Sequence, residues 1–292
     1  MDLVVGATGS VGGRIALGLG ERGRQVRAMV RAGATRPQAA PLAAAGIEVV
    51  EGDVTRPASL PAALAGVDTV ISTVSGFPAG GPEALRRVDL EGVGAMIEAG
   101  ERAGARRFIY VSYAGNIEID SPMHVAKRSN EARLRESTMS AVILRPTCFT
   151  EVWLSPMLGF DPAAGRVRIF GTGDTPVSYI AMADVAACAV AVAAGGVADE
   201  VLELGGPEAL TQHQVVAIFE RALGRTLEVE RVPLAALEDQ YRAAQDPVQK
   251  TFAALGLARA LGSPIPDARA DAARFGVRLH TVEDHARSMS GA

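Results

Sequence analysis

The chain has 292 residues, of which 48% are hydrophobic and 21% charged, and its formal net charge is -4. This composition excludes long disordered segments, and the acidic balance argues against a protein that binds nucleic acid through general basicity. The length fits one large domain, or a domain with a smaller cap.

The first half of the chain alternates short apolar runs with helical patterns. Strands are predicted, in chain order, at Leu3–Val5, Gln25–Val30, Ile47–Val50, Thr69–Ile71, Phe108–Val111 and Ala141–Leu144. Helices are predicted between them at Val11–Arg22, Pro82–Ala103 and Met123–Ser137. Because parallel strands need crossover helices that cover both faces, this order predicts an α/β fold with a doubly wound parallel sheet.

The alternation ends after Pro146. Thr147–Thr175 is rich in glycine, proline and aromatic residues, Val177–Ala194 is typical of a strand followed by a helix, and Val201–Leu204 of a strand. The chain beyond Gly205 is mostly helical in pattern. We therefore predict a first domain at residues 1–150, to which 177–204 return, and a smaller, discontinuous C-terminal substrate-binding cap at 151–176 and 205–292.

Targeting signals and cysteine usage favour a cytoplasmic protein. The two cysteines, Cys148 and Cys188, cannot form a framework of several disulfides, and the N-terminus has no cleavable signal pattern. The most apolar long stretch, 183–197, contains Asp184 and is too short to span a bilayer. We expect a monomer or homodimer without nucleic acid or membrane partners.

A glycine-rich turn, GATGSVGG, joins the first strand to the first helix. Gly6 supplies backbone freedom for the sharp turn, Gly9 allows close approach of a diphosphate, and Gly12 lets the helix pack on the strand. The N-terminus of the helix offers unpaired N–H groups to an anion. We predict a dinucleotide site at Gly6, Thr8, Gly9, Ser10, Val11 and Gly12; a turn that serves packing alone is the alternative.

The residue that ends the second strand indicates which dinucleotide binds. A carboxylate at this position would bind the ribose 2'-hydroxyl of NAD, whereas this chain has Arg31, whose donor fork suits the 2'-phosphate of NADP. Arg36 is expected to assist, and a solvated surface arginine is the alternative. Asp53 and Val54 follow the third strand and are predicted to line the cofactor groove, where Asp53 either accepts from the adenine amino group or stabilises a turn.

Several segments together resemble a known family, the NmrA-like group of atypical short-chain dehydrogenase/reductases, which includes isoflavone reductase-like, triphenylmethane reductase-like and quinone reductase-like enzymes. They are GATGSVGG, VRAMVR, GIEVVEGDV, AGVDTVIST, GARRFIYVS, VILRPTCF and SYIAMADVA, and they cover the chain to about residue 190. The resemblance implies an NADP(H)-binding Rossmann domain and a cap that closes over a substrate near the nicotinamide.

The resemblance also implies where catalysis takes place. In the wider superfamily a serine, and a tyrosine four residues before a lysine, carry the acid and base chemistry. Ser112 and Lys127 match two of these positions, but Met123 stands where the tyrosine belongs and cannot donate a proton. Lys127 is therefore expected to bind the nicotinamide ribose or to donate directly; an exposed helix lysine is the alternative.

Two other side chains are candidates for the missing proton donor. His124 lies three residues before Lys127, near the same helix face, and titrates in the useful range. Tyr113 follows Ser112 directly. A structural or solvated histidine and a packing tyrosine are the respective alternatives.

Two further positions lie near the expected nicotinamide. One is expected to contact the cofactor, and the other concerns a relay of active-site water molecules. Thr73, at the end of the fourth strand, is expected to contact the cofactor. Relatives often carry the helix pattern NxxxG, where this chain has Asp89 and Gly92, which puts a water relay built on that asparagine in doubt.

The loop that begins at Pro146 is expected to line the substrate site. Pro146 and Phe149 are predicted to contact the cofactor, and Phe149, Trp153, Met157 and Phe160 offer an apolar wall for a flat aromatic substrate, with cap packing as the alternative. No spacing of histidines, cysteines or acids predicts a metal ion, and no arginine cluster predicts a phosphorylated substrate.

The leading hypothesis is an NADPH-dependent oxidoreductase, a ketone or quinone reductase that transfers hydride to a quinone, aromatic ketone or conjugated enone without the usual tyrosine. The alternative is a non-catalytic, NADP(H)-sensing regulatory protein of the NmrA type. The missing tyrosine favours the second hypothesis, while Lys127 and Ser112 favour the first.

Overall fold

The computed structural model describes residues 1–31, 36–77, 80–195, 197–266 and 268–290, which form two compact units. Unit 1 contains residues 1–112, 122–145 and 186–202. Unit 2 contains residues 113–121, 146–185 and 203–292. The segment 113–121, which the predicted bounds place in the first domain, packs with unit 2.

A seven-stranded sheet organises unit 1, with strand order β3-β2-β1-β4-β5-β6-β9. The strands are β1 (Asp2–Val5), β2 (Val26–Val30), β3 (Glu48–Glu51), β4 (Thr69–Ser72), β5 (Arg107–Val111), β6 (Ser140–Pro146) and β9 (Glu200–Leu204). Each predicted strand up to β6 is present, and each differs from its predicted bounds by no more than a few residues. The predicted fold class, a doubly wound parallel sheet, is confirmed.

The register of the parallel strands aligns their carboxyl ends along one edge. Val5 of β1 pairs with Met29 of β2 and with Ser72 of β4, which in turn pairs with Tyr110 of β5. The residues that directly follow β1, β2, β4 and β5 therefore emerge at the same edge. These residues are Gly6, Arg31, Thr73 and Ser112, all of which the sequence predicted as site residues.

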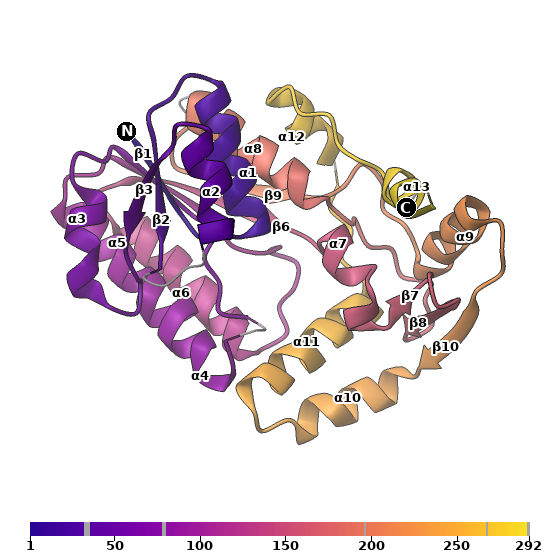
Figure 1. Cartoon of the computed structure of the whole chain (residues 1–292). Helices are drawn as coiled ribbons and strands as arrows, with labels where there is room; N and C mark the ends of the chain where they lie inside the picture. Colours follow the sequence, from indigo (N-terminus) through magenta and orange to yellow (C-terminus); the bar gives the residue numbers. More distant parts are fainter. Residues whose placement is uncertain (32–35, 78–79, 196, 267, 291–292) are drawn as a thin grey trace. The chain divides into compact units, whose positions relative to one another are not determined.

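Helices cover both faces of the sheet (Figure 1). One face carries α1 (Ser10–Glu21), α2 (Arg36–Ala44) and α8 (Met182–Gly195), and Gly18 of α1 lies directly against Val190 of α8. The other carries α3 (Leu60–Leu64), α5 (Val93–Arg102) and α6 (Pro122–Glu136). The short α3 was not predicted, because it is little more than one turn long, has Pro61 in its first turn and is soon followed by Gly66.

The core of unit 1 lies between the sheet and the layer of α3, α5 and α6. Its members are fully buried aliphatic and aromatic side chains such as Leu3, Leu60, Val70, Met96 and Phe108. Burial of each such side chain contributes about 2 kcal/mol from the hydrophobic effect. The other face is packed as well, since Ile15 and Leu19 of α1 are fully buried. The strands are therefore held by packing on both faces, which fixes the positions of their carboxyl ends.

The predicted long helix at 82–103 is present but not uniform. It consists of α4 (Pro82–Ala84), the π-helical segment η2 (Leu85–Gly92) and α5. A Cβ atom on Gly92 would lie only 2.8 Å from the Cγ2 atom of Val54, so the π-helical turn packs directly on the loop after β3. Wider helical turns of this kind occur often near functional sites.

Unit 2 contains a three-stranded sheet, with order β10-β8-β7, that the sequence pattern did not reveal. The strands are β7 (Phe160–Asp161), β8 (Arg166–Phe170) and β10 (Glu228–Val232). The predicted strand after Val177 is wrong, because only isolated pairings form there, at Val177 and Ile180. The two errors have different causes. The missed strands are short, and β10 is largely exposed, so they lack the buried apolar run by which strands are recognised. The segment 177–180 is buried like a strand but forms only isolated pairings.

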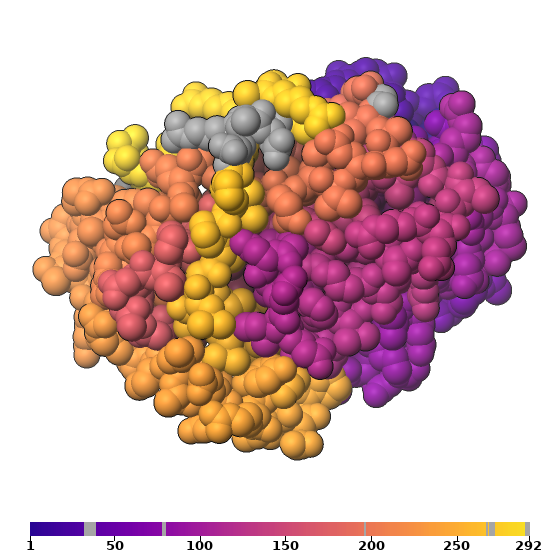
Figure 2. Space-filling view, turned by 180° about the vertical axis from the view of Figure 1, so that it is seen from behind, coloured from indigo at the N-terminus to yellow at the C-terminus, as the bar shows by residue number. Residues whose placement is uncertain are grey.

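The helices of unit 2 are α7 (Thr150–Trp153), α9 (Gln212–Leu223), α10 (Leu234–Ala243), α11 (Pro247–Leu261), α12 (Ala268–Arg274) and α13 (Val282–Ser290). The helices α10 and α11 pack on one another and form the continuous orange and gold surface at the bottom of Figure 2. None of the helices formed by the described residues is long and apolar enough to cross a membrane.

The glycine turn yields a test of the fold. A Cβ atom on Gly12 would collide with the carbonyl oxygen of Gly6 and lie 2.7 Å from Oγ1 of Thr73, so Gly12→Ala should lower the free energy of unfolding by about 2 kcal/mol. Urea denaturation measures this change. The control is Gly20→Ala in the same helix, where the new methyl group would lie 3.8 Å from Ile47 and should be neutral or slightly stabilising. Equal effects of the two substitutions would contradict the close contact.

Candidate functional site

The turn after β1 is closed by two features of its glycines. Gly6 has a φ of +87°, a conformation that glycine adopts readily, and its carbonyl oxygen accepts a hydrogen bond of 2.9 Å from the N–H of Gly9. Gly12 packs so closely on Gly6 that a side chain cannot fit between them. The two glycines therefore hold the first turn of α1 against the end of β1.

The N-terminus of α1 is open to an anion. Thr8, Gly9 and Ser10 are exposed, Val11 is half-buried, and the first turn of the helix carries no acidic side chain. The first N–H groups of a helix have no partner within it and carry a partial positive charge. The turn thus fits the diphosphate of a dinucleotide: its surface is accessible, side chains are small, and no carboxylate competes.

The next two strand ends supply Arg31 and Asp53. Arg31 is exposed and close enough to Asp53 for its charge to act on that carboxyl group. Asp53 accepts hydrogen bonds from the backbone N–H (2.9 Å) and the hydroxyl (2.7 Å) of Thr55, which is the turn-stabilising alternative considered for this residue. Burial raises the pKa of Asp53, but the hydrogen bonds from Thr55 and the charges of Arg56 and Arg31 outweigh burial and leave the pKa lowered.

Two other residues predicted to contact the cofactor, Val54 and Thr73, make contacts within unit 1. Val54 belongs to the core of unit 1, where it packs on Gly92. The hydroxyl of Thr73 donates to the carbonyl oxygen of Val5 at 3.2 Å and lies over the glycine turn. The side chain of Arg36 lies outside the described residues.

Lys127 is a buried cation at the carboxyl edge of the sheet. Its side chain is only 6% exposed, which excludes the alternative of a solvated helix lysine. Nζ donates to the carbonyl oxygen of Val111, the last residue of β5, at 3.1 Å and lies 4.9 Å from the centre of the Tyr110 ring. One of the three N–H groups of the ammonium is thereby fixed, and the hydrogen bond holds the charge at the end of β5.

Ser112 donates its hydroxyl proton to another residue of the site. Its Oγ atom lies 2.6 Å from Oε1 of Glu131, and both side chains are buried. A carboxylate can only accept, so the single proton of the serine is used in this contact. In this arrangement Ser112 offers lone pairs, and not a proton, to a further group.

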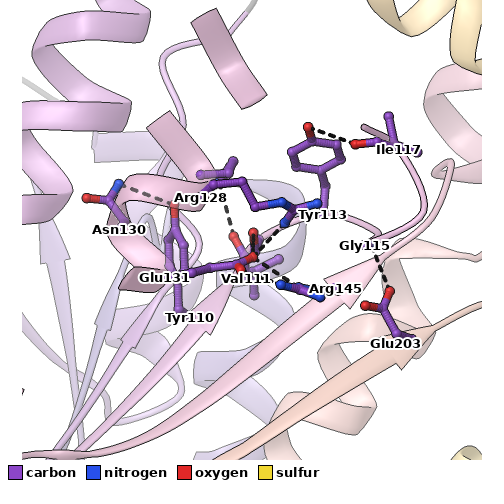
Figure 3. Close-up of polar contacts among 12 residues, drawn as sticks. Tyr110, Val111, Tyr113, Gly115, Ile117, Arg128, Asn130, Glu131, Arg145 and Glu203 are labelled. Atoms are coloured by element: carbon purple, nitrogen blue, oxygen red, sulfur yellow. Dashed lines mark hydrogen bonds and ion pairs between the residues drawn. The ribbon is translucent and has the colours of Figure 1, made fainter. Parts of the chain in front are cut away.

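Glu131 is the centre of a buried ionic cluster that the sequence reasoning missed. Arg145 binds both carboxylate oxygens, at 3.1 and 2.5 Å, and Arg128 binds Oε1 at 2.7 Å. Figure 3 shows the guanidinium groups of Arg128 and Arg145 directed at the carboxylate. Burial raises the pKa of Glu131, but the hydrogen bonds from Arg145 and Ser112 and the charge of Arg128 outweigh it and lower the pKa. Glu131 is therefore ionised at neutral pH.

Asp89 has a structural role in unit 1. Its buried carboxylate accepts from the hydroxyl of Ser75 (2.7 Å) and the N–H of Gly76 (2.8 Å) and so fixes the loop after β4. Its carbonyl oxygen accepts from the side-chain amide of Asn130 at 2.5 Å. The interactions join the π-helical segment to both the loop and α6, in agreement with the doubt about a water relay at this position.

The remaining predicted residues are divided between the units. In unit 1, Met123 and His124 lie in the first turn of α6 and are half-buried. In unit 2, the ring of Tyr113 packs against Ile117 and its hydroxyl donates to the carbonyl oxygen of that residue at 3.3 Å, as Figure 3 shows. These contacts match the packing alternative for Tyr113.

The loop after β6 belongs to unit 2. The carbonyl oxygen of Pro146 accepts from the N–H of Ala114, and Phe149 pairs with Ile180. Of the expected apolar wall, Trp153 and Phe160 are buried in the core of unit 2, whereas Met157 is 56% exposed. Cap packing therefore explains Trp153 and Phe160, and the predicted wall is incomplete.

The fold and the turn define a Rossmann-type, dinucleotide-binding α/β protein. A family model described as NAD(P)H-binding matches residues 6–195. The chain belongs to this NAD(P)H-binding family, and it shares the fold of the reductases that the sequence resembles.

Relatives of the chain include both reductases and assembly factors. It is 34% identical over 250 residues to the (4-alkanoyl-5-oxo-2,5-dihydrofuran-3-yl)methyl phosphate reductase of Streptomyces griseus, covering 85% of this chain and 82% of that protein. It is 28% identical to the photosystem II assembly factor Ycf39 of Trieres chinensis, covering 81% and 73%. Among solved structures, the NADPH-dependent quinone oxidoreductase QOR2 of Escherichia coli, complexed with NADPH, has a TM-score of 0.80 at 22% identity, covering 99% of each chain.

The ionic cluster around Glu131 can be tested by measuring the free energy of unfolding at different pH values. Glu131→Gln removes the charge that balances Arg145 and Arg128, and should lower the free energy of unfolding at pH 7 by about 2 kcal/mol. Because folding lowers the pKa of Glu131, its contribution is fully present above the ordinary value of 4.5 and is lost as the pH falls below it. The difference between wild type and variant should therefore shrink under acid.

Denaturation curves at several pH values measure this difference. Glu98→Gln is the control, because Glu98 forms only an exposed pair with Arg102 and its loss should change little at any pH. A wild-type advantage over Glu131→Gln that persists unchanged into acid would contradict the assignment.

Proposed function

We propose that the chain is an NADPH-dependent reductase that transfers hydride to a ketone, quinone or conjugated enone. The observation that carries the proposal is the buried ammonium of Lys127, held at the end of β5. The strand order places β5 beside β4 and β4 beside β1, whose end bears the glycine turn. A nucleotide site and a buried positive charge therefore share one edge of the same sheet.

The residues of unit 1 support NADP(H) over NAD(H). The turn at Gly6–Gly13 would hold the diphosphate, and exposed Arg31 would bind the 2'-phosphate of the adenosine ribose. The hydrogen bonds of Asp53 favour its role in a turn, although it remains at the adenosine end of the site.

The proton chemistry differs from that of the tyrosine-dependent reductases. NADPH, when bound, would supply a hydride, and the negative charge that develops on an oxygen of the substrate would need a cation or a proton. Met123 can supply neither, and the proton of Ser112 is engaged with Glu131. We assign stabilisation of that oxygen to the ammonium of Lys127, which also donates the proton directly or through water.

The substrate class is supported by the name of a relative. The name of the Streptomyces griseus substrate describes a ring double bond conjugated to carbonyl groups. A conjugated enone or quinone accepts hydride at carbon and places the resulting charge on oxygen, which is the charge that Lys127 would stabilise. Phe149 and Met157 are the members of the predicted apolar wall that stay outside the core of unit 2.

The second candidate function is a non-catalytic, NADP(H)-sensing regulator. Two observations favour it: the serine proton is engaged within the protein, and a relative at 28% identity is named as an assembly factor. A regulator would bind NADPH and a protein partner in a nucleotide-dependent manner, and would not oxidise NADPH with any member of a panel of quinones, aromatic ketones and enones. Turnover with any member of the panel at rates typical of enzymes decides for the reductase.

The role of Lys127 is tested by Lys127→Met. With the best substrate of the panel, kcat should fall by at least about 100-fold, because the variant lacks the charge and the proton that the oxygen needs. The control is Lys250→Met, since Lys250 is the other lysine of the chain and its ammonium contacts the carbonyl oxygen and ring of Tyr241. Undiminished turnover by Lys127→Met would reject the assignment. A separate titration of NADPH fluorescence shows how much of any loss is due to nucleotide binding.

The choice of nucleotide is tested by Arg31→Ala. The affinity for NADPH should fall about tenfold or more, while the affinity for NADH should stay within about twofold, because only NADPH carries the 2'-phosphate. Arg22→Ala, at an exposed position after α1, is the control. An equal loss of both affinities in Arg31→Ala would show that the arginine does not read the phosphate.

A further inference from the structure

Unit 2 contains a buried positive charge that the proposed reaction does not use. Arg259 lies on α11 and is only 1% exposed, and it is the largest of the fully buried side chains that the structure describes. Arginine keeps its charge at every pH at which a protein folds, so a complete charge lies in this core.

Aromatic rings surround the guanidinium group. Its Cζ atom lies 5.5 Å from the ring centre of Trp153, 5.2 Å from that of Phe170 and 5.8 Å from that of Tyr179. These residues come from α7, from β8 and from the segment before α8, which lie beside α11 in unit 2 (Figure 1). Ring faces stabilise a cation electrostatically, but they do not replace acceptors for the N–H groups in the guanidinium plane.

The hydrogen bonds of Arg259 are incomplete. Of its five N–H groups, one on Nη1 donates to the carbonyl oxygen of Trp153 at 3.1 Å, while Nε is buried without an acceptor. The buried hydroxyl of Tyr179 is close enough to Arg259 for a side-chain hydrogen bond to act on its pKa, but this contact lacks normal hydrogen-bond geometry. Among the residues that the structure describes, no carboxylate forms an ion pair with Arg259.

The titratable groups near Arg259 do not supply the missing negative charge. Burial raises the pKa of the Cys148 thiol to about 11, although the charge of Arg259 acts in the opposite direction. Burial also raises the pKa of the Tyr179 phenol against the same charge. Both groups are therefore neutral at physiological pH, and within the described part of the chain no negative charge is paired with Arg259.

We propose that Arg259 binds a small organic carboxylate carried on an aromatic or conjugated ring. A carboxylate matches the guanidinium fork with two parallel hydrogen bonds and brings one negative charge for one positive charge. A phosphate dianion would instead leave excess negative charge among three rings. The rings of Trp153, Phe170 and Tyr179 suit a flat ligand. The site goes beyond the proposed function and does not depend on hydride transfer. Because the cluster is closed to solvent, the ligand enters by local opening of unit 2.

The proposal predicts how removal of the charge affects the free protein. A buried charge retained for a ligand destabilises the empty protein, so Arg259→Met, of similar size and apolar, should leave the melting temperature unchanged or raise it. If Arg259 served only to hold the rings together, the same substitution would lower the melting temperature or abolish folding. Either of these results would overturn the proposal. Arg242→Met, at an exposed position of α10, is the matched control.

Ligand binding is then measured with benzoate as the probe. Benzoate at about ten times its dissociation constant should raise the melting temperature of the wild type by about 3 °C, with no rise in Arg259→Met. Neutral benzamide and inorganic phosphate should give much smaller shifts. Tyr179→Phe, which removes one hydroxyl, should weaken benzoate binding several-fold. The proposal fails if benzoate has no effect on the wild type, if Arg259→Met responds equally, or if benzamide or phosphate matches benzoate. Assays of turnover are not needed, so failure here leaves the proposed reductase untouched.

Discussion

The close contact between Gly6 and Gly12 is the constraint on which the arrangement of the nucleotide site depends. It fixes the start of α1 against the end of β1, which lies between β2 and β4 in the sheet. Since the strands are parallel and aligned in register, fixing one carboxyl end fixes the whole edge. The hydroxyl of Thr73 packs on the same contact, so β4 is tied to the turn as well. A helix N-terminus displaced from this edge would direct its N–H groups away from the residues that follow the other strands.

The ionic cluster around Glu131 is a second interaction that holds the elements of the site in place. The carboxylate belongs to α6, Ser112 follows β5, and Arg145 lies in β6, so one buried charge joins a helix to two strands. The same cluster determines the direction of the Ser112 hydroxyl and thereby what that residue can offer to a ligand. Lys127 lies one turn earlier on α6 and is held by the carbonyl oxygen of Val111. Ser112 and Lys127, two of the four predicted catalytic residues, are thus fixed by contacts within unit 1.

The sequence predicted unit 1 well because its strands are apolar runs separated by helices, a pattern that burial on both faces requires. The glycine turn and the residues that follow the strands also predicted that the site lies at the carboxyl edge of the sheet. Sequence reasoning missed Glu131 because an acid among arginines on a helix is typical of a solvated face, and the partner Arg145 is fourteen residues away on a strand. Arg259 was missed for the same reason: Trp153 and Tyr179 are brought to it only by tertiary packing. The exposed strand β10 has too few buried residues for its alternation to be recognised.

The two buried charges of opposite sign, on Glu131 and Arg259, have different surroundings. Glu131 is surrounded by cations and by a hydroxyl donor, so folding stabilises its ionised form and lowers its pKa. Arg259 has rings, one carbonyl oxygen and neutral groups around it, and these stabilise its charge less than an ion pair with a carboxylate would. A structural role explains the first arrangement completely. The second is costly unless a ligand brings the negative charge, and this asymmetry is the physical reason to look for a binding function in unit 2 that is separate from the chemistry at Lys127.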